Sequence, residues 1–212
     1  MVACCLGPSF DVETMQRATK DQRDVNSFLD VCIERGYLNR KDISGISPEY
    51  SWQHDQIRQA ASKLIPDKQH ESIHLLIGTR LYMRTPTSEL DRFIFVIVDS
   101  MNEGKRLLQN AEQRYDLVSL NLKAGESLIS SSAFSSSVHY IMTGMSLLDS
   151  SSWSDRYDLT IRVYNVATVR TRLSFKCAEV LVLNPYLDSL SLDIVGSHVY
   201  YWRFHETLQP GQ

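Results

Sequence analysis

Apolar residues recur every three or four positions over most of this chain, the spacing that gathers them on one face of an α-helix. A clear example is residues 23–35, and Gly36 is expected to end that helix. A shorter helix is predicted over residues 12–20. Asp11 should be its N-cap, because a carboxylate can accept hydrogen bonds from the free amides of the first turn.

Two short segments after these helices have the pattern of β-strands. Residues 37–40 and 50–53 flank a polar stretch that contains Gly45 and Pro48, which predicts two strands joined by a loop. Two helices followed by a hairpin is the order typical of a winged-helix domain. We therefore expect a winged-helix remnant with one β-hairpin at residues 1–65.

The rest of the chain, residues 66–212, has the pattern of successive helices separated by short polar joints. A helix that begins near His54 and ends before Pro66 leads into them. The later helices are expected at residues 67–83, 88–108, 115–129, 133–148 and 153–173. Antiparallel pairs of such helices are the unit of a tetratricopeptide-like solenoid. The predicted fold is thus mainly α, a winged helix followed by helical repeats.

Residues 175–208 have a less regular pattern. Pro185 interrupts the segment, and its β-branched and aromatic residues favour strand as much as helix. We interpret this segment as two short helices.

Composition and charge narrow the functional classes. With 43% hydrophobic and 22% charged residues among 212, the chain is typical of a globular protein. A net charge of −3 creates no positive electrostatic field that would attract nucleic acid or anionic lipid. No stretch is long and apolar enough for a membrane helix, and the four cysteines fit neither a CxxC pair nor a disulfide framework. The expected location is cytoplasmic.

A set of motifs carries a family resemblance. Residues 50–61, Tyr-Ser-Trp-Gln-His-Asp-Gln-Ile-Arg-Gln-Ala-Ala, resemble the end of the winged-helix domain in signal-transduction ATPases of the STAND type, including the large kinase/ATPase/histidine-kinase hybrids. Residues 5–11 and 28–38 look like earlier parts of that domain. Residues 64–66, 74–78, 121–125, 131–134, 140–148 and 153–157 are similar to the tetratricopeptide-like region that follows it. The resemblance covers residues 3–180.

The family's phosphate-binding loop has no counterpart here. The chain contains no G-x-x-x-x-G-K-[ST] sequence and no kinase catalytic-loop signature, so we expect neither enzymatic activity nor a bound cofactor. The resemblance implies a region C-terminal to a nucleotide-binding domain. The expected partners are proteins on the helical-repeat face and the nucleotide-binding domain of a parent protein, with no nucleic acid and no membrane.

Gln53-His54-Asp55 is similar to the Met-His-Asp motif of related STAND ATPases. The resemblance implies that His54 reaches the β-phosphate of ADP when a nucleotide domain is present. A ring N–H suits that task, because it can donate to a phosphate oxygen. Asp55 is expected to cap the helix that follows. The alternative is that His54 ends a strand and bonds a neighbouring carbonyl.

His70, Glu71 and His74 match the zinc-hydrolase pattern H-E-x-x-H. On a helix the two imidazoles lie one turn apart, and the glutamate could deprotonate a metal-bound water. A third ligand is not signalled, because the extended pattern requires Gly and His where this chain has Ile77 and Arg80. A zinc hydrolase is an alternative function, but a solvent-flanking helix face and no metal are the preferred interpretation.

Two further features leave open questions. Serines 127, 130, 131, 132, 135, 136 and 137 are expected to form a joint between two helices, with a phosphorylation switch as the alternative.

A winged helix can also bind DNA. The helix at residues 23–35 carries Asp24, Asp30 and Glu34, however, which repel phosphate. Nucleic-acid binding is therefore a second alternative function.

Overall fold

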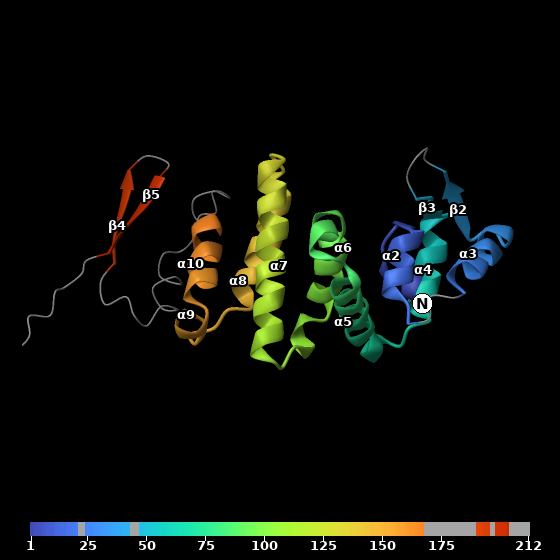
Figure 1. The fold of residues 1–212 in the computed structure, drawn as a ribbon, viewed down its shortest axis with the longest axis horizontal. Coiled ribbons are helices and arrows are strands. Elements are labelled where there is room, and N and C mark those ends of the chain that lie inside the picture. Colours follow the sequence, from blue (N-terminus) through green and yellow to red (C-terminus); the bar gives the residue numbers. More distant parts are fainter. Residues whose placement is uncertain (21–23, 43–46, 168–189, 196–197, 204–212) are drawn as a thin grey trace, which may run out of the picture. The chain divides into compact units, whose positions relative to one another are not determined.

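The computed structural model describes residues 1–20, 24–42 and 47–167, together with the backbone of residues 190–195 and 198–203. This part of the chain is mainly helical, as predicted (Figure 1). The chain divides into two compact units, Met1–Gln113 and Arg114–Gln212, which are described separately. The domain boundary expected after residue 65 falls inside the first unit.

The first unit begins with short helices and a small sheet. Its elements are α1 (Val2–Cys5), β1 (Ser9–Asp11), α2 (Val12–Ala18), α3 (Val25–Glu34), β2 (Leu38–Lys41), β3 (Glu49–Trp52) and α4 (Asp55–Lys63). The strands are antiparallel in the order β1-β3-β2, so the predicted hairpin of β2 and β3 is confirmed. Strand β1 was not predicted from the sequence. Phe10 of β1 pairs with Tyr50 of β3, and their rings stack 6.2 Å apart.

The local signals that begin α2 and end α3 act as predicted. The carboxylate of Asp11 accepts a hydrogen bond from the backbone amide of Thr14 at 2.6 Å, which caps α2. Gly36 has φ +72°, the left-handed conformation that closes a helix. The amide of Tyr37 then donates to the carbonyl of Cys32 at 2.8 Å. Both turns therefore follow from local hydrogen-bond chemistry.

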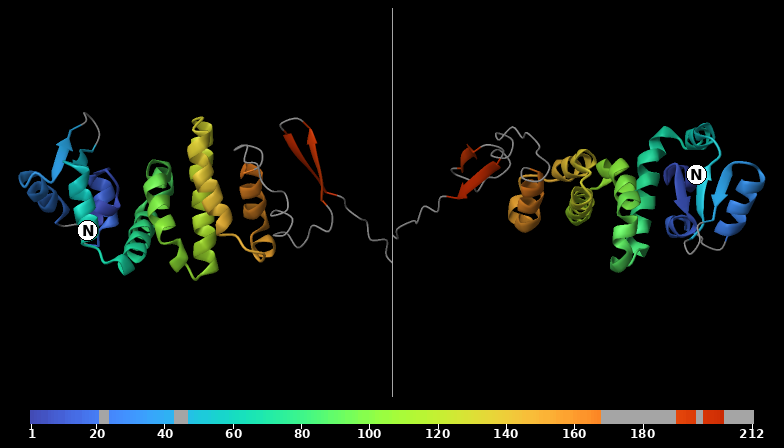
Figure 2. Two further views of the ribbon diagram at one scale, coloured as in Figure 1. Left: turned by 180° about the vertical axis from the view of Figure 1, so that it is seen from behind. Right: turned by 90° about the horizontal axis from the view of Figure 1, so that it is seen from above.

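A pair of longer helices completes the first unit. It consists of α5 (Asp67–Arg84), the 3-10 turn η1 (Thr87–Glu89), α6 (Leu90–Glu103) and the 3-10 turn η2 (Lys105–Leu107). Helices α5 and α6 pack side by side (Figures 1 and 2). Gly78 allows their close approach, because a Cβ there would lie 2.8 Å from the backbone nitrogen of Met101. Ile77, Leu81 and Ile97 are buried in the core of this unit.

The second unit is also helical in its described part. It contains most of α7 (Ala111–Ser130), then α8 (Phe134–Ser146), α9 (Ser152–Asp155) and α10 (Tyr157–Asn165). A buried cluster joins them: Tyr115, Val118, Leu122, Ile141, Leu148, Trp153, Val163, Tyr164, Val166 and Ala167. A Cβ on Gly125 would overlap the side chain of Ile141, so α7 and α8 also cross at a glycine. The single helix predicted at residues 153–173 is divided, because α9 ends at Asp155 and Arg156, with φ −140°, separates it from α10. The part of that prediction after residue 167 lies outside the described residues.

Two short helices were predicted in residues 175–208, and this prediction is wrong where the chain is described. Strands β4 (Leu190–Val195) and β5 (His198–Arg203) form an antiparallel hairpin in which Val195 pairs with His198. In β4, apolar residues alternate with polar ones from Leu190 to Ile194, a period of two that favours a strand. The remainder of that prediction lies outside the described residues.

Within the described ranges, the model contains no helix that combines the length and the apolar character needed to cross a bilayer.

Candidate functional site

His54 is the residue that the family resemblance singles out, and it lies on the surface. It follows Gln53 at the end of β3 and takes the N-cap position of α4, with φ −144° and ψ 143°. Both Gln53 and His54 are exposed. The imidazole makes no capping hydrogen bond. The ring N–H of an exposed imidazole can donate to a hydrogen-bond acceptor.

Asp55 is the first residue of α4 rather than its cap, which corrects the prediction. Its carboxylate accepts hydrogen bonds from the side chains of Arg58 at 2.7 Å and Gln59 at 2.5 Å. These bonds hold the pKa of Asp55 below its usual value, the one from Arg58 having the largest effect. The carboxylate still lies at the positive end of the helix dipole. The carboxylate accepts from these two side chains, whereas the carboxylate of a cap would accept from backbone amides of the first turn.

The histidines of the H-E-x-x-H motif have different surroundings. The Nε2 atom of His70 lies 3.0 Å from the carbonyl oxygen of Ile65. His74 is half-buried, and its Nδ1 atom is buried without a hydrogen-bond partner. Burial lowers the pKa of His74, an effect that Glu103 opposes and His70 adds to. One imidazole is thus engaged at the turn between α4 and α5, and the other is partly withdrawn from water.

Glu71 lies nearer the surface than His74. Its carboxylate oxygen is 4.0 Å from a guanidinium nitrogen of Arg106, and its side chain is 43% exposed. Across the ranges that the structure describes, no three His, Cys, Asp or Glu side chains are grouped so that they could hold one metal ion. A zinc site needs three protein ligands at least. The geometry therefore gives no support for a zinc hydrolase beyond the H-E-x-x-H pattern itself.

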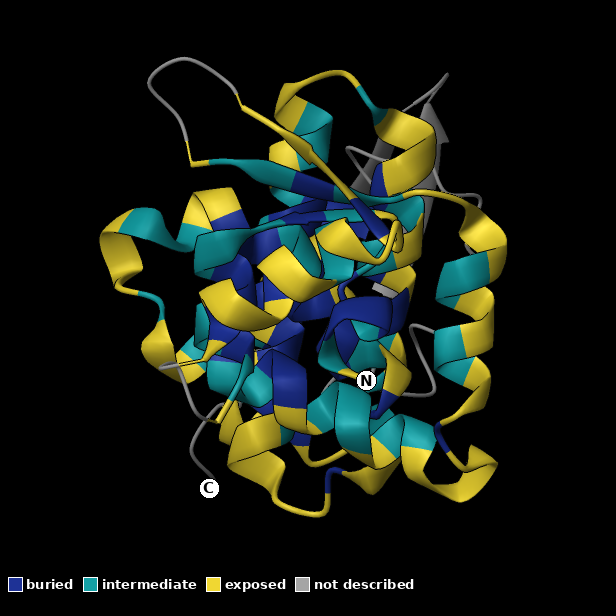
Figure 3. Cartoon of the chain, turned by 90° about the vertical axis from the view of Figure 1, so that its right-hand side faces the viewer, coloured by how far each residue is buried: buried dark blue, intermediate teal, exposed yellow. Residues whose placement is uncertain are grey.

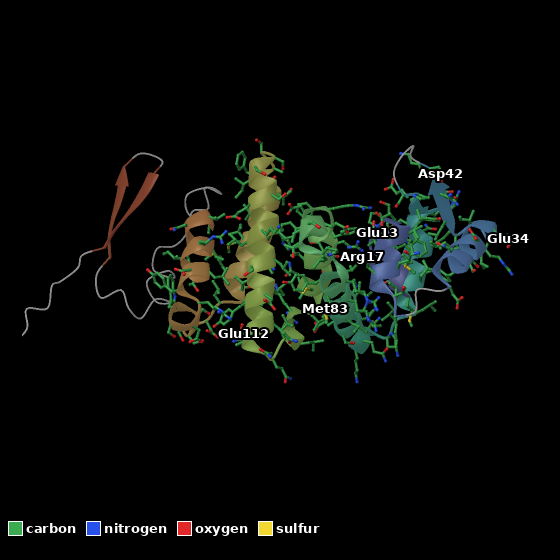
Figure 4. All side chains as sticks on the ribbon, in the orientation of Figure 1. Glu13, Arg17, Glu34, Asp42, Met83 and Glu112 are labelled. Atoms are coloured by element: carbon green, nitrogen blue, oxygen red, sulfur yellow. The ribbon has the colours of Figure 1, made fainter. Side chains whose placement is uncertain are left out.

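An ionic cluster that the sequence pattern does not predict joins α2 and β1 to η1 and α6. We call it the Arg17–Arg92 cluster; its members are Asp11, Glu13, Arg17, Glu89, Arg92 and Phe93. Arg17 pairs with Glu13 and Glu89, and Arg92 pairs with Asp11 and Glu13 at 2.7 Å each. Figure 4 labels Glu13 and Arg17 on α2. The two guanidinium carbons lie 4.6 and 4.7 Å from the centre of the buried Phe93 ring. Cation–π contacts of this kind strengthen when the groups are desolvated.

One local signal for this cluster was available in the sequence. Glu13 and Arg17 are four residues apart, a spacing that pairs opposite charges on a helix. Their partners in η1 and α6 are more than 70 residues away, and no short-range pattern predicts such contacts. Arg84 adds another link, because its guanidinium donates to the carbonyl oxygen of Arg17 at 3.0 Å and to that of Thr19.

The serine-rich segment is the expected joint between helices. Helix α7 ends at Ser130 and α8 begins at Phe134. Ser132 has φ +63°, and the amide of Ala133 donates to the carbonyl of Leu128 at 2.8 Å. This is the same type of closure that Gly36 provides for α3.

Comparison with known proteins finds a relative among curated proteins but no matching family model. No protein-family model matches this sequence. No solved structure matches it either. Among curated proteins, the chain is similar to the hybrid signal transduction histidine kinase G of Dictyostelium discoideum, with 28% identity over 139 aligned residues. The match takes in 54% of this chain and 4% of the kinase, so the chain spans a small fraction of its relative's length. It relates the chain to a signal-transduction protein.

Proposed function

We propose that this chain is a non-catalytic regulatory and protein-interaction module of a cytosolic signal-transduction ATPase. In this proposal, a winged helix at residues 1–65 couples the nucleotide state of a neighbouring domain to a sensor made of helical repeats. The observation that carries the proposal is the placement of His54, exposed at the end of β3 and directly before α4. The similarity to a hybrid histidine kinase supports it independently.

The architecture around His54 supports a winged helix. Helices α2 and α3 are followed by the hairpin of β2 and β3, and β1 adds its strand to the free side of β3. The register places Leu38 opposite Trp52 and Tyr50 opposite Phe10. The indole N–H of Trp52 also donates to the carbonyl of Gly7 at 3.2 Å. These contacts fix the end of β3, and with it the position of His54.

The helix pairs support a repeat architecture. Helices α5 and α6 cross closely at Gly78, and α7 and α8 cross closely at Gly125. In each pair a small residue lets two helices approach closely. Repeats of this kind bury one face on their neighbours and leave another for a protein partner.

The role proposed for His54 depends on a nucleotide domain outside this chain. One ring N–H that donates to a charged phosphate contributes about 1.5 to 3 kcal/mol, which corresponds to about a tenfold change in affinity or more. Asp55 and Arg58, which pair beside His54, would hold the start of α4 in place. Alone, the chain is expected neither to hydrolyse ATP nor to retain ADP.

The decisive experiment begins with the transcript upstream of the codon for Met1. We expect an in-frame P-loop there, and a longer product that retains ADP after desalting. His54→Ala should then weaken ADP retention about tenfold or more. His139→Ala is the matched control, because His139 is also exposed but lies on α8. A longer product that lacks a P-loop, or equal ADP loss in both variants, would refute the proposed role of His54.

Stability measurements on the chain itself provide a second check. Because His54 is exposed and makes no capping bond, His54→Ala should change the free energy of unfolding by less than about 1 kcal/mol. A collapse of the fold in this variant would show that the histidine has a structural role instead.

A further inference from the structure

The outward face of α3 carries large apolar side chains that remain in water. Phe28 is 46% exposed and Val31 is 52% exposed, whereas Val25 and Leu29 are buried in the first unit. Helix α3 lies at the edge of that unit (Figure 1), and Figure 3 views the chain from the same side with exposed residues in yellow. Adjoining apolar side chains at the surface, flanked by polar ones, mark interaction sites.

The charges on this face have a defined order. Asp24, Phe28, Val31 and Arg35 lie within about 60° of arc on the helix, at about 100° per residue. Both charged residues are exposed, and the carboxylate of Asp24 does not cap the helix that it precedes. The face therefore runs from acidic through apolar to basic along the helix axis.

This order is symmetric about one point, midway between residues 29 and 30. Asp24 and Arg35 are equally distant from that point, at about 8 Å along the axis, because the rise is about 1.5 Å per residue. Phe28 and Val31 are also equally distant from it. A twofold axis through this point would place each charged residue opposite its counter-charge and each apolar residue opposite another apolar residue.

We propose that α3 is a docking surface for a second copy of this chain. The two α3 helices lie antiparallel about the twofold axis, with Asp24 of one copy against Arg35 of the other. Phe28 of one copy packs against Val31 of the other in the centre. Contacts of this kind are isologous, since the same surface serves both subunits.

The charges of α3 favour a second copy over a nucleic acid. Asp24, Asp30 and Glu34 are all exposed on α3 and would repel a phosphate backbone. A second copy instead brings Arg35 to Asp24 at both ends of the contact. The small side chains of Ser27 and Cys32 flank this face on its two sides, which allows the helices to approach to about 8 to 10 Å.

The interface is small, because it consists mainly of one ten-residue helix from each copy. Interfaces well below the standard size are transient. We expect a dissociation constant of about 10 to 100 µM, which is measurable by sedimentation velocity of the full chain. This inference does not rest on the proposed function, because it uses only the face of α3.

Charge reversal tests the pairing. Asp24→Arg places two arginines together and should raise the dissociation constant about tenfold, and Arg35→Asp should have a similar effect. The double variant, Asp24→Arg with Arg35→Asp, restores opposite charges across the axis. Its dissociation constant should return to within about threefold of the original value. Circular dichroism spectra and melts establish that each variant is folded.

The matched control is Asp30→Arg, which makes the same change of charge on the same helix. Asp30 is exposed but points about 160° away from Phe28, so its reversal should leave dimerisation unchanged within about twofold. The proposal is overturned if the wild-type chain remains monomeric at 500 µM. It is also overturned if Asp30→Arg weakens the dimer as much as Asp24→Arg, or if the double variant is not restored.

Cross-linking provides a second measurement of the arrangement. The double variant Asp24→Cys with Arg35→Cys should form an intermolecular disulfide between residue 24 of one copy and residue 35 of the other under mild oxidation, identified by mass spectrometry of the linked peptides. Asn26→Cys with Arg35→Cys is the control, because residue 26 is exposed on the other side of α3. Equal linkage in both double variants, or none from the first, would contradict the antiparallel arrangement.

Discussion

Asp11 performs two functions with a single carboxylate. One oxygen accepts from the amide of Thr14 and caps α2, and the other accepts from Arg92 of α6 at 2.7 Å. Burial opposes ionisation of this group, but the hydrogen bonds from Thr14 and Arg92 outweigh it and hold the pKa of Asp11 below its usual value. The cap was evident in the sequence, whereas the contact with Arg92 was not.

Two substitutions at Asp11 separate these functions. Asp11→Ala removes both the cap and the ion pair and should lower the free energy of unfolding by about 1 to 3 kcal/mol. Asp11→Asn keeps a good capping side chain but removes the charge that faces Arg92, so its loss should be under about 1 kcal/mol. Urea denaturation measures both. Equal losses in the two variants would mean that the cap contributes little.

His74 gives the first unit a dependence on pH. Its pKa is lowered from the ordinary value of 6.5 by burial, so the unfolded chain binds the proton at a higher pH than the folded chain. The contribution of His74 to the free energy of unfolding is therefore fully present above about pH 6.5. It declines as the pH falls toward the lowered pKa, by at most about 1.4 kcal/mol per pH unit for one proton.

Urea midpoints at pH 7.5 and 5.5 test this dependence. His74→Phe should make the difference between the two midpoints smaller, because it removes the titrating group from a half-buried position. His139→Gln, at an exposed position on α8, should leave the difference unchanged. An identical pH dependence in the wild type and His74→Phe would show that other groups cause it.

At the scale of elements, the joint between α7 and α8 contains a side chain where glycine would fit better. Ser132 has φ +63°, a conformation that costs a residue with a side chain about 1 to 2 kcal/mol. Ser132→Gly removes that cost and should raise the free energy of unfolding by about 0.5 to 1 kcal/mol, after the greater entropy of glycine in the unfolded chain is deducted. Thermal melts followed by circular dichroism measure the change.

A neighbouring serine provides the control for this prediction. Ser131 is also exposed, and its backbone lies outside the left-handed region. Ser131→Gly gains nothing from relief of strain and adds flexibility, so it should be neutral or slightly destabilising. If both glycine variants destabilise the protein alike, the backbone of Ser132 is not strained.

The elements that the sequence predicted well are those with local signals. The apolar spacing of α3 and α5 lies within those helices, and Asp11 and Gly36 lie within two residues of the helix that each begins or ends. Strand β1 has three residues and pairs with β3 about 40 residues away, so its existence depends on a contact that no window contains. The hairpin of β4 and β5 was assigned to helices, although its alternating apolar residues favoured strands.

The candidate site shows the same division. The motif around His54 could be found by resemblance, and the structure adds that the imidazole is exposed. The role of Asp55 as a cap was predicted from residue type alone. In the structure its carboxylate accepts hydrogen bonds from the side chains of Arg58 and Gln59 instead. The symmetric order of charged and apolar residues on α3 can be found in the sequence. Only the burial of Val25 and Leu29 shows which face of this helix remains outside the core.

At the scale of the whole chain, the contacts of α2 argue for a first folding unit longer than residues 1–65. Arg84 of α5 donates to the carbonyls at the end of α2, and the Arg17–Arg92 cluster ties α2 to α6. Met15 and Ala18 of α2 are 5% and 0% exposed, and α2 packs against α5. Removal of α5 and α6 would expose these side chains and leave the charges of α2 without their distant partners.

Two truncated chains test this argument. Residues 1–113 should unfold cooperatively, because the unit keeps its ion pairs and its buried face. Residues 1–65 should melt at least about 10 °C lower or without a cooperative transition, since a domain of this size has little core and loses roughly 2 to 4 kcal/mol of buried contacts.

The Arg92→Ala variant of residues 1–113 is the intermediate case. It removes two ion pairs and a contact with Phe93 but leaves the apolar packing, so it should melt between the two fragments. If residues 1–65 melted as high as residues 1–113, these residues would fold on their own and the boundary after residue 65 would be the physical one.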